Sequence, residues 1–375
     1  MAMLQDTKDE DTCAVAVFVS PHGFGHAARA TSVLESLYEI DPSIQYEIFT
    51  KIPPWFFKNS LSKTFSYHPL ETDIGFVQET PFREDFLKTK QRLNAFFPFE
   101  RSKIERLSRL ITRLKCKLVI CDIAPMGIQV AKVAGVPSVL VENFTWDWIY
   151  QRYPGFNRQI QNHIGYLRSL FETADYHIQT EPICSNRNPD LTTYPVSRKC
   201  KTPRQKIRNM LGISTESKMV LISFGGIPEQ ITFFERLTTL ENVRFVVAGG
   251  ADSLKIEKNR ILLPHRSDYF HPDLVNAADA VIGKAGYSTV AEVYNAGTPF
   301  GYIPLPNSPE SPRLVEFIKQ NMAGFEIEES IFRKGDWLPI LRKILRIPHK
   351  KPITPNGADQ IARFIHKLLI TSQGV

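Results

Sequence analysis

Two glycine-bearing segments of the sequence could bring backbone N–H groups, hydroxyls and an imidazole to one ligand. The first is Pro21-His-Gly-Phe-Gly-His-Ala-Ala-Arg29, and the second is Gly283-Lys-Ala-Gly-Tyr-Ser-Thr-Val-Ala-Glu292. Each follows a short apolar run and precedes an amphipathic run, which predicts a strand, a tight turn and a helix. Such a junction exposes unpaired N–H groups and the positive end of a helix dipole, so it suits an anion such as a diphosphate.

The first segment could supply a proton acceptor. Gly25 lets a ligand approach the backbone closely, and His26 lies where the expected helix begins. A histidine near the positive end of a helix has a lowered pKa and can act as a general base near neutral pH. Arg29, one turn further on, is then a candidate for contacting an acceptor substrate. The simpler interpretation is that His22 and His26 only hydrogen-bond within the turn.

The second segment could hold a nucleoside diphosphate. Gly283 and Gly286 shape the loop, while Ser288 and Thr289 can cap the helix and also offer hydroxyls to a diphosphate. Glu292 follows on the inner face of the first turns, where a carboxylate can accept hydrogen bonds from both ribose hydroxyls. The alternative is a capping box in which Glu292 bonds back to the turn, but that pattern does not account for the glycines.

Two further segments follow expected strand ends, where ligands bind in open α/β sheets. Gly225 and Gly226, in Ser223-Phe-Gly-Gly226, form a small-residue turn that could lie against phosphate oxygens. Asn143 and Trp146, in Glu142-Asn-Phe-Thr-Trp-Asp-Trp148, could bind an acceptor through an amide and an aromatic ring. An ordinary loop explains the first segment equally well, and a tryptophan-rich core corner explains the second.

The elements that must position these residues alternate between strand-like and helix-like patterns. Apolar runs typical of buried parallel strands lie at 14–19, 46–50, 118–121, 138–141, 177–179, 219–223, 243–248, 261–263, 280–282 and 300–303. Helical periodicity predicts helices at 104–114, 127–134, 229–240, 289–296 and about 357–369. Two such arrays in succession indicate an α/β protein with two Rossmann-like domains that face each other across a cleft.

The predicted boundaries follow a Pro-, Lys- and Arg-rich stretch in the middle of the chain. We expect an N-terminal acceptor domain over 12–183, a linker over 184–208, a C-terminal nucleotide-sugar donor domain over 209–356, and a C-terminal helix and tail over 357–375. The stretch from 50 to 99 is rich in Phe and Pro and has poor periodicity. A local subcore is the simpler interpretation of it, and an acceptor-binding or membrane-facing surface is the functional one.

Bulk composition restricts the class of protein. Hydrophobic residues make up 43% of the 375 residues and charged residues 23%, as in an ordinary globular chain. The net charge of +7 is scattered, and its densest run reads as a solvated linker, so we expect no nucleic-acid partner. The five cysteines show no metal-ligand spacing, which suits reduced thiols in the cytoplasm. No apolar run is long enough to span a membrane, and peripheral contact with the inner face of the membrane stays open.

Taken together, the motifs resemble those of the nucleotide-sugar glycosyltransferases with two Rossmann-like domains, the GT-B superfamily. The lipid-linked N-acetylglucosaminyltransferase group of peptidoglycan synthesis has a comparable Gly-His loop, Gly-Gly turn and Gly-x-Ser/Thr-x-x-Glu element. The glycosyltransferase-like N-terminal region of arabinokinase-type sugar kinases has similar sequence motifs as well. It has a Gly-His-Gly-Phe-Gly-His-x-x-Arg loop and a Gly-Lys-x-Gly-Tyr-x-Thr-x-x-Glu element. No kinase-like segment follows in this chain.

The resemblance implies a cytoplasmic hexosyltransferase that moves a sugar from a nucleotide-diphosphate donor, with UDP-sugars favoured, to the hydroxyl of a glycan, lipid or small molecule. It also implies inversion at the anomeric carbon. Where the peptidoglycan group has a polar stretch for the donor's sugar, this chain has Glu310 within a Pro-rich segment, so the sugar stays open. No metal or other cofactor is expected, because helix dipoles can meet the diphosphate charge. The alternatives are a nucleotide-sugar 2-epimerase and a non-catalytic nucleotide-sugar sensor or accessory protein.

Overall fold

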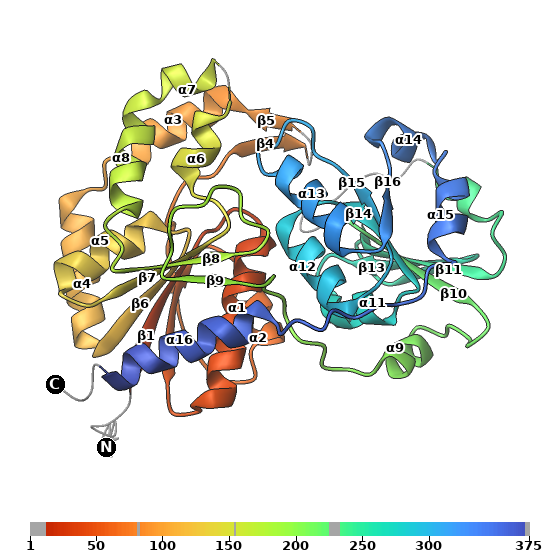
Figure 1. Cartoon of the computed structure of the whole chain (residues 1–375), viewed down its shortest axis with the longest axis horizontal. Helices are drawn as coiled ribbons and strands as arrows, with labels where there is room; N and C mark the ends of the chain where they lie inside the picture. Colours follow the sequence, from red (N-terminus) through yellow and green to blue (C-terminus); the bar gives the residue numbers. More distant parts are fainter. Residues whose placement is uncertain (1–12, 81–82, 154, 225–232, 372–375) are drawn as a thin grey trace, which may run out of the picture.

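Two α/β domains, each built around a seven-stranded sheet, lie side by side in the chain (Figure 1). The computed structural model describes residues 13–80, 83–153, 155–224 and 233–371. Within these ranges the predicted fold class is confirmed, because all but one of the neighbouring strand pairs in the two large sheets are parallel. Apolar, β-branched runs such as Ala14–Val19 are buried along their whole length, as strands covered on both faces require.

The first sheet has the strand order β3-β2-β1-β6-β7-β8-β9. Its strands are β1 Ala14–Val19, β2 Gln45–Thr50, β3 Ser66–Pro69, β6 Cys116–Asp122, β7 Ser138–Glu142, β8 Tyr176–Thr180 and β9 Leu191–Thr193. The helices of this half are α1 Phe24–Ile40, α2 Pro54–Ser60, α3 Phe86–Phe96, α4 Arg101–Arg113, α5 Pro125–Ala134, α6 Trp146–Gln151, α7 Phe156–Gln159 and α8 Gln161–Phe171. A small antiparallel pair, β4 Val77–Thr80 and β5 Arg83–Asp85, lies near the second domain (Figure 1).

The second sheet has the order β12-β13-β11-β10-β14-β15-β16. Its strands are β10 Lys218–Ser223, β11 Val243–Ala251, β12 Lys255–Glu257, β13 Arg260–Pro264, β14 Ala280–Lys284, β15 Phe300–Ile303 and β16 Gly324–Glu326, of which β12 is antiparallel to β13. The helices of this half are α9 Arg204–Met210, α10 Phe234–Leu237, α11 His271–Ala277, α12 Tyr287–Ala296, α13 Ser311–Asn321, α14 Glu329–Lys334 and α15 Leu338–Ile344. The strand order reverses direction beside β1 in one sheet and beside β10 in the other, and such switch points are where open sheets bind ligands.

Most predicted elements agree with the structure to within three residues at each end. The helix expected at 229–240 is wrong in its described part, where only Phe234–Leu237 is helical and turns follow it. The linker in the structure is also shorter than the predicted linker over 184–208. Its first part includes β9, which pairs with β8, and its last part begins α9, which packs against α11.

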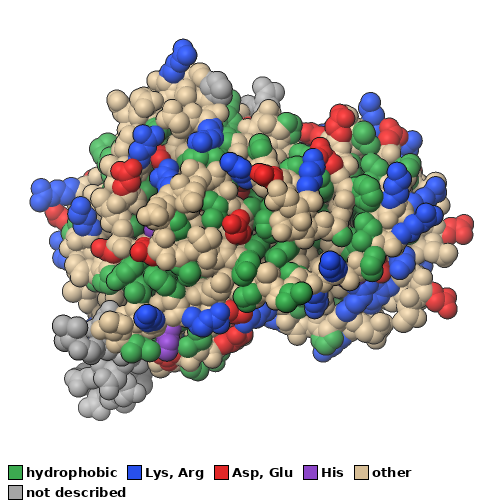
Figure 2. Space-filling model, in the orientation of Figure 1, with side chains coloured by type: hydrophobic (Ala, Val, Ile, Leu, Met, Phe, Trp, Pro, Cys, Tyr) green, Lys and Arg blue, Asp and Glu red, His purple; other side chains and the backbone are tan. Residues whose placement is uncertain are grey.

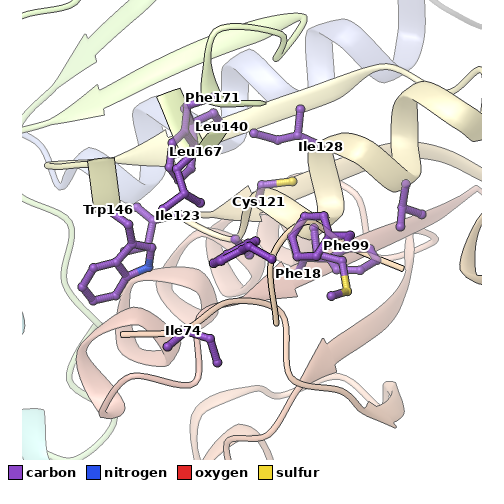
Figure 3. Packing of buried hydrophobic residues seen from close by; sticks show 14 of the residues in the cluster. Phe18, Ile74, Phe99, Cys121, Ile123, Ile128, Leu140, Trp146, Leu167 and Phe171 are labelled. Carbon is purple, nitrogen blue, oxygen red and sulfur yellow. The ribbon is translucent and has the colours of Figure 1, made fainter. Parts of the chain in front are cut away.

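The last helix, α16 Gly357–Thr371, returns to the N-terminal domain and packs along α1 (Figure 1). Its apolar face joins the core on that side of the first sheet: Ala358, Ile361, Ala362, Ile365 and Leu369. The opposite face of the same sheet has its own core, which contains Phe18, Cys121 and Trp146 and also Phe99 of the 50–99 stretch (Figure 3). The end of the chain therefore completes the domain with which the chain begins.

Half of the aromatic residues whose burial is described in the 50–99 stretch are buried, which favours the subcore interpretation: Phe56, Phe57, Phe76, Phe97 and Phe99 are all within 8% exposure, whereas Phe86 is 40% exposed. Lys and Arg side chains are spread over both halves of the face shown in Figure 2. Among the helices of the described residues, none combines the length and the apolar character that crossing a bilayer requires.

Candidate active site

A cavity of about 650 Å³ lies between the two domains, where the N-termini of α1 and α12 approach each other. Most of the predicted site residues that the structure describes line it: Gly25, His26, Arg29, Asn143, Trp146, Gly286, Ser288, Thr289 and Glu310. Residues about 260 positions apart in the sequence are thus brought to one site. Gly225 and Gly226 lie outside the described residues.

Both helices begin on glycine and leave their first N–H groups without a side-chain cap. The N-cap of α1 is Gly23, whose φ of 78° lies in the left-handed region that glycine adopts without strain. The N-cap of α12 is Gly286, so Ser288 and Thr289 lie in the first turn and the expected capping role for them is wrong. A Cβ added to Gly25 would lie 3.5 Å from the Ser288 hydroxyl, so the two helix ends are close neighbours. Unpaired N–H groups at two helix ends are a suitable environment for an anion.

His26 forms a hydrogen-bonded pair with Asp122, which is not among the predicted site residues. His26 follows β1 on α1, and Asp122 ends the neighbouring strand β6, so the switch point of the sheet brings them together. The Nδ1 atom of His26 lies 3.0 Å from Oδ1 of Asp122. Because a carboxylate only accepts hydrogen bonds, Nδ1 carries the proton and the Nε2 lone pair is left to act. The signal available in the sequence was a carboxylate directly after the apolar run at 118–121, where an expected strand ends.

Burial lowers the pKa of His26, and it outweighs the hydrogen bond and charge of Asp122, which act in the opposite direction. The ring is 8% exposed, so little water reaches it. The main cause of the lowered pKa is therefore desolvation and not the helix dipole that the sequence suggests. An imidazole that is neutral at pH 7 is the form that can accept a proton.

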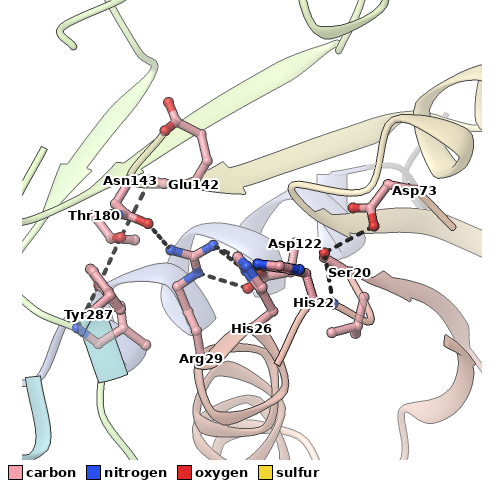
Figure 4. A network of polar contacts seen from close by, with 12 residues as sticks. Ser20, His22, His26, Arg29, Asp73, Asp122, Glu142, Asn143, Thr180 and Tyr287 are labelled. Atoms are coloured by element: carbon pink, nitrogen blue, oxygen red, sulfur yellow. Dashed lines mark hydrogen bonds and ion pairs between the residues drawn. The ribbon is translucent and has the colours of Figure 1, made fainter. Parts of the chain in front are cut away.

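Arg29 lies beside this pair and bonds to Asp122 (Figure 4). Its Nε and Nη2 atoms donate to the two oxygens of Asp122 at 2.8 and 2.7 Å, and its Nη1 donates to Oδ1 of Asn143 at 2.7 Å. Burial raises the pKa of Asp122, but the charge of Arg29 and the bond from His26 outweigh this and hold it below the usual value. Since Arg29 is 2% exposed and its donors are engaged, its geometry favours positioning over the predicted contact with an acceptor.

Asn143 also bridges the two domains. Its Nδ2 donates to Oε1 of Glu310 at 2.7 Å, and Glu310 immediately precedes α13 in the second domain. Burial raises the pKa of Glu310, although the Asn143 hydrogen bond and the charge of Arg29 partly offset it. The two predicted residues thus meet on one wall of the cavity.

Trp146 lines the cavity with its ring and anchors its polar edge in the N-terminal domain. Its Nε1 donates to Oδ2 of Asp73 at 3.0 Å. The Ser20 hydroxyl donates to Oδ1 of the same carboxyl at 3.0 Å (Figure 4). Burial raises the pKa of Asp73 to about 8, against the effect of these two bonds. The His22 ring packs edge-on against Trp146 at 5.2 Å, and burial lowers its pKa to about 3.

Glu292 faces a second cavity of about 150 Å³, which shares Ser288 and Thr289 with the larger one. Its carboxylate is 4% exposed and already has partners. Oε1 accepts from Nε and Nη2 of Arg198, and Oε2 lies 2.6 Å from Nδ1 of His271. Burial raises the pKa of Glu292, but Arg198 and His271 outweigh it and hold the pKa below its usual value. The capping-box alternative is wrong, because neither oxygen bonds back to the turn.

The second cavity is bounded by the end of β10. The Ser223 hydroxyl lies 2.9 Å from Nε2 of His271, whose other ring nitrogen contacts Glu292. Gly283 lies opposite Ser223 in the neighbouring strand, and a Cβ there would overlap the carbonyl oxygen of Ser223. Glycine at 283 therefore permits close contact of two strands, which differs from the predicted role in shaping the loop. Among the described residues no group of three or more His, Cys, Asp or Glu side chains could hold a metal ion.

Comparisons with known proteins agree with this architecture. Residues 233–314 match the family model described as the glycosyltransferase family 28 C-terminal domain. The chain is 27% identical over 367 residues to the L-arabinokinase of Arabidopsis thaliana, a match that covers 95% of this chain and 34% of that protein. The chain therefore spans about a third of the length of this curated relative.

Solved structures of glycosyltransferases share the fold over nearly the whole chain. Glycosyltransferase VinC in complex with dTDP superposes with a TM-score of 0.63 at 14% identity, covering 96% of this chain and 99% of the other. The MurG protein of Acinetobacter baumannii superposes with a TM-score of 0.53 at 18% identity, covering 95% and 99%. The fold implied by the resemblance to these proteins is confirmed: the chain has the GT-B fold of these structures, and its residues 233–314 match the model of the glycosyltransferase family 28 C-terminal domain.

Proposed function

We propose that the protein is a glycosyltransferase that moves a hexosyl group from a nucleoside-diphosphate sugar to an acceptor hydroxyl. The observation that carries this proposal is the 650 Å³ cavity, in which the neutral His26 of one domain faces the uncapped start of α12 in the other. A base on one wall and an anion site on the opposite wall are what transfer from a diphosphate leaving group requires. The family 28 segment and the GT-B fold support the same reaction class.

The donor would lie along the second domain. The first-turn N–H groups of α12 and the hydroxyls of Ser288 and Thr289 would bind the diphosphate, and Glu310 would contact the sugar. Glu292, in the adjoining cavity, would receive the ribose hydroxyls. We favour UDP-sugars as donors, with dTDP-sugars as the second choice because a structural neighbour was solved with dTDP.

The acceptor would enter from the first domain and lose its proton to Nε2 of His26. The acceptor oxygen then attacks the anomeric carbon, the bond from that carbon to the diphosphate oxygen breaks, and the configuration inverts. The proton stays on His26, where Asp122 stabilises the imidazolium through Nδ1. Charge developing on the leaving diphosphate would be met by the N–H groups of two helix ends, so we propose a reaction without metal.

The acceptor side of the cavity has aromatic walls. The rings of Phe76, Phe144, Trp146 and Tyr153 line it together with Ile149. Such rings stack on the apolar faces of a sugar or of another cyclic acceptor, and a few polar groups then set its orientation. This composition supports a glycan or small molecule, or the head of a lipid, as the acceptor.

Turnover of UDP-sugars tests the proposal, with release of UDP measured against a panel of acceptors. His26→Ala should lower kcat about 10²- to 10⁴-fold, as loss of a general base does, and leave UDP affinity nearly unchanged. Glu292→Ala should instead weaken UDP binding by about 1.5–3 kcal/mol, the range for hydrogen bonds to a charged group. Tight UDP binding without turnover of any UDP- or dTDP-sugar would contradict the transferase proposal and favour a sensor.

A further inference from the structure

Arg198 is a linker residue whose guanidinium is buried at the cavity that contains Glu292. The side chain is 11% exposed, although it belongs to a segment that connects two domains. Its Nε and Nη2 atoms lie 3.0 and 2.9 Å from Oε1 of Glu292, and its Nη1 lies 3.3 Å from the Ser60 hydroxyl on α2. An arginine that only joined two domains would be expected in water, where its charge is better solvated.

Aromatic rings from both domains surround this guanidinium. Its carbon lies 4.8 Å from the centre of the Phe56 ring, in the first domain, and 4.9 Å from that of Phe270, in the second. The side chain of Trp55 lines the same cavity. A planar group beside aromatic faces, with hydrogen-bond donors directed at a carboxylate, is what a nucleoside would also present here: a flat base and a ribose diol.

We propose that Arg198 occupies the nucleoside subsite of the ligand-free chain, and that a nucleoside diphosphate binds by displacing its guanidinium from Glu292 and from the rings of Phe56 and Phe270. The inference rests on the proposed function, because it concerns the donor of that reaction. It adds that the base is recognised by aromatic residues of both domains and that the linker competes with the donor.

The arrangement of the two cavities supports this assignment. Ser288 and Thr289 line both of them, so a donor whose diphosphate lies at the start of α12 would extend its nucleoside into the smaller one. There the Glu292 oxygens are already paired, Oε1 with Arg198 and Oε2 with His271. A diol that needs both oxygens can bind only after the two Arg198 bonds break. If only a fraction of the molecules has these bonds broken, the apparent affinity for the nucleoside is reduced by that fraction.

Displacement of Arg198 would also release a contact between the domains. The same side chain contacts Ser60 and Phe56 of the first domain and Glu292 and Phe270 of the second. Lys201 offers a matched comparison three residues further along. Its Nζ lies 5.0 Å from the Phe270 ring and 3.0 Å from the carbonyl oxygen of Asn59, so it bridges the same domains without touching Glu292.

Calorimetric titration with UDP, and in parallel with dTDP, tests the proposal on the full chain. Arg198→Ala should bind UDP about tenfold more tightly than the wild type, because two hydrogen bonds to a charged group no longer compete. Arg198→Lys keeps the charge but loses the planar fork, so it should bind with intermediate affinity. Lys201→Ala should stay within about twofold of the wild type, since Lys201 makes no bond to Glu292.

The outcomes separate this inference from the proposed function. If both Arg198 variants bind UDP as tightly as the wild type or more weakly, Arg198 only orients Glu292. That result would overturn the inference and leave the proposed transferase function standing. Absence of UDP and dTDP binding from wild type and from both variants would overturn the two together. A thermal melt of each variant shows that it is folded, and if Arg198→Ala is not, Arg198→Lys decides. Phe270→Leu should weaken UDP binding several-fold both in the wild type and in the Arg198→Ala variant, because the base loses its aromatic neighbour.

Discussion

The Nδ2 atom of Asn143 lies 2.7 Å from Oε1 of Glu310, and this bond joins the two domains at the wall of the large cavity. Asn143 follows β7 in one sheet, whereas Glu310 lies beyond β15 in the other. The bond brings the two domains into direct contact beside the cavity. It also holds the Glu310 carboxyl where a donor's sugar would lie.

This position predicts that Glu310 discriminates the sugar and not the nucleotide. Glu310→Ala should leave the Kd for UDP within about twofold, while affinity for the UDP-sugar that is turned over should fall by about 1.5–3 kcal/mol, because a sugar hydroxyl loses its carboxylate. Titration of both ligands into both proteins measures the difference. Equal losses for UDP and UDP-sugar would mean that Glu310 acts on domain arrangement and does not contact the sugar.

The pKa of His26 predicts the acidic side of the rate profile. Burial lowers this pKa below the usual value of 6.5, so the catalytic, unprotonated form persists into mildly acidic solution. The plot of log kcat/KM against pH should therefore fall only below pH 6.5, with a slope of about one for a single proton. In Asp122→Asn the midpoint of this profile should lie at a lower pH, since the carboxylate that stabilises the imidazolium is gone. A midpoint above pH 6.5 in the wild type would show that another group limits the rate.

How far the sequence predicts this site depends on whether the partners are local. The loops around His26 and Gly286 were predictable because strand, turn and helix signals lie within a dozen residues of each other. The Asp122 partner of His26 was missed because it is 96 positions away, and only the order of strands in the sheet makes them neighbours. Glu292 was correctly placed on the inner face of its helix, but its pairing with Arg198 could not be read from periodicity. A basic linker residue looks solvated until the fold closes around it.

The fold was predicted more fully than its irregular parts. Buried parallel strands such as β1 and β15 agree with the structure at both ends, since their uniform apolar character leaves few alternatives. The predicted linker is too long because it includes the short strand β9. The sequence of β9 has no strand pattern of its own, and the strand forms by pairing with β8. Return of α16 to the first domain is likewise a tertiary contact.

The charge pair of Asp122 and Arg29 predicts a large loss of stability when one partner is removed. Both side chains are within 2% exposure, so Asp122→Asn would leave a buried guanidinium without its carboxylate. The free energy of unfolding should fall by about 3–5 kcal/mol, as for other broken buried pairs. Denaturant unfolding measures it. Asp336→Asn is the control, because Asp336 pairs with Arg236 at a site where both are about half exposed, and its loss should be under about 1 kcal/mol.

Asp73 predicts how stability changes with pH. Burial raises its pKa from 3.8 to about 8, so between these values the folded protein holds a proton that the unfolded chain releases. Because stability falls with rising pH wherever the folded state binds more protons, this carboxyl contributes a loss of stability as pH rises from about 4 to about 8.

Asp73→Asn keeps the shape of the side chain, and the Ser20 hydroxyl can turn to accept from the new amide. The melting temperature of the variant should therefore depend less on pH than that of the wild type, and the variant should gain most near pH 8. Melting curves of both proteins at several pH values between 5 and 8 check this. Parallel curves would mean that Asp73 is ionised in the folded protein throughout, held by Trp146 and Ser20 alone.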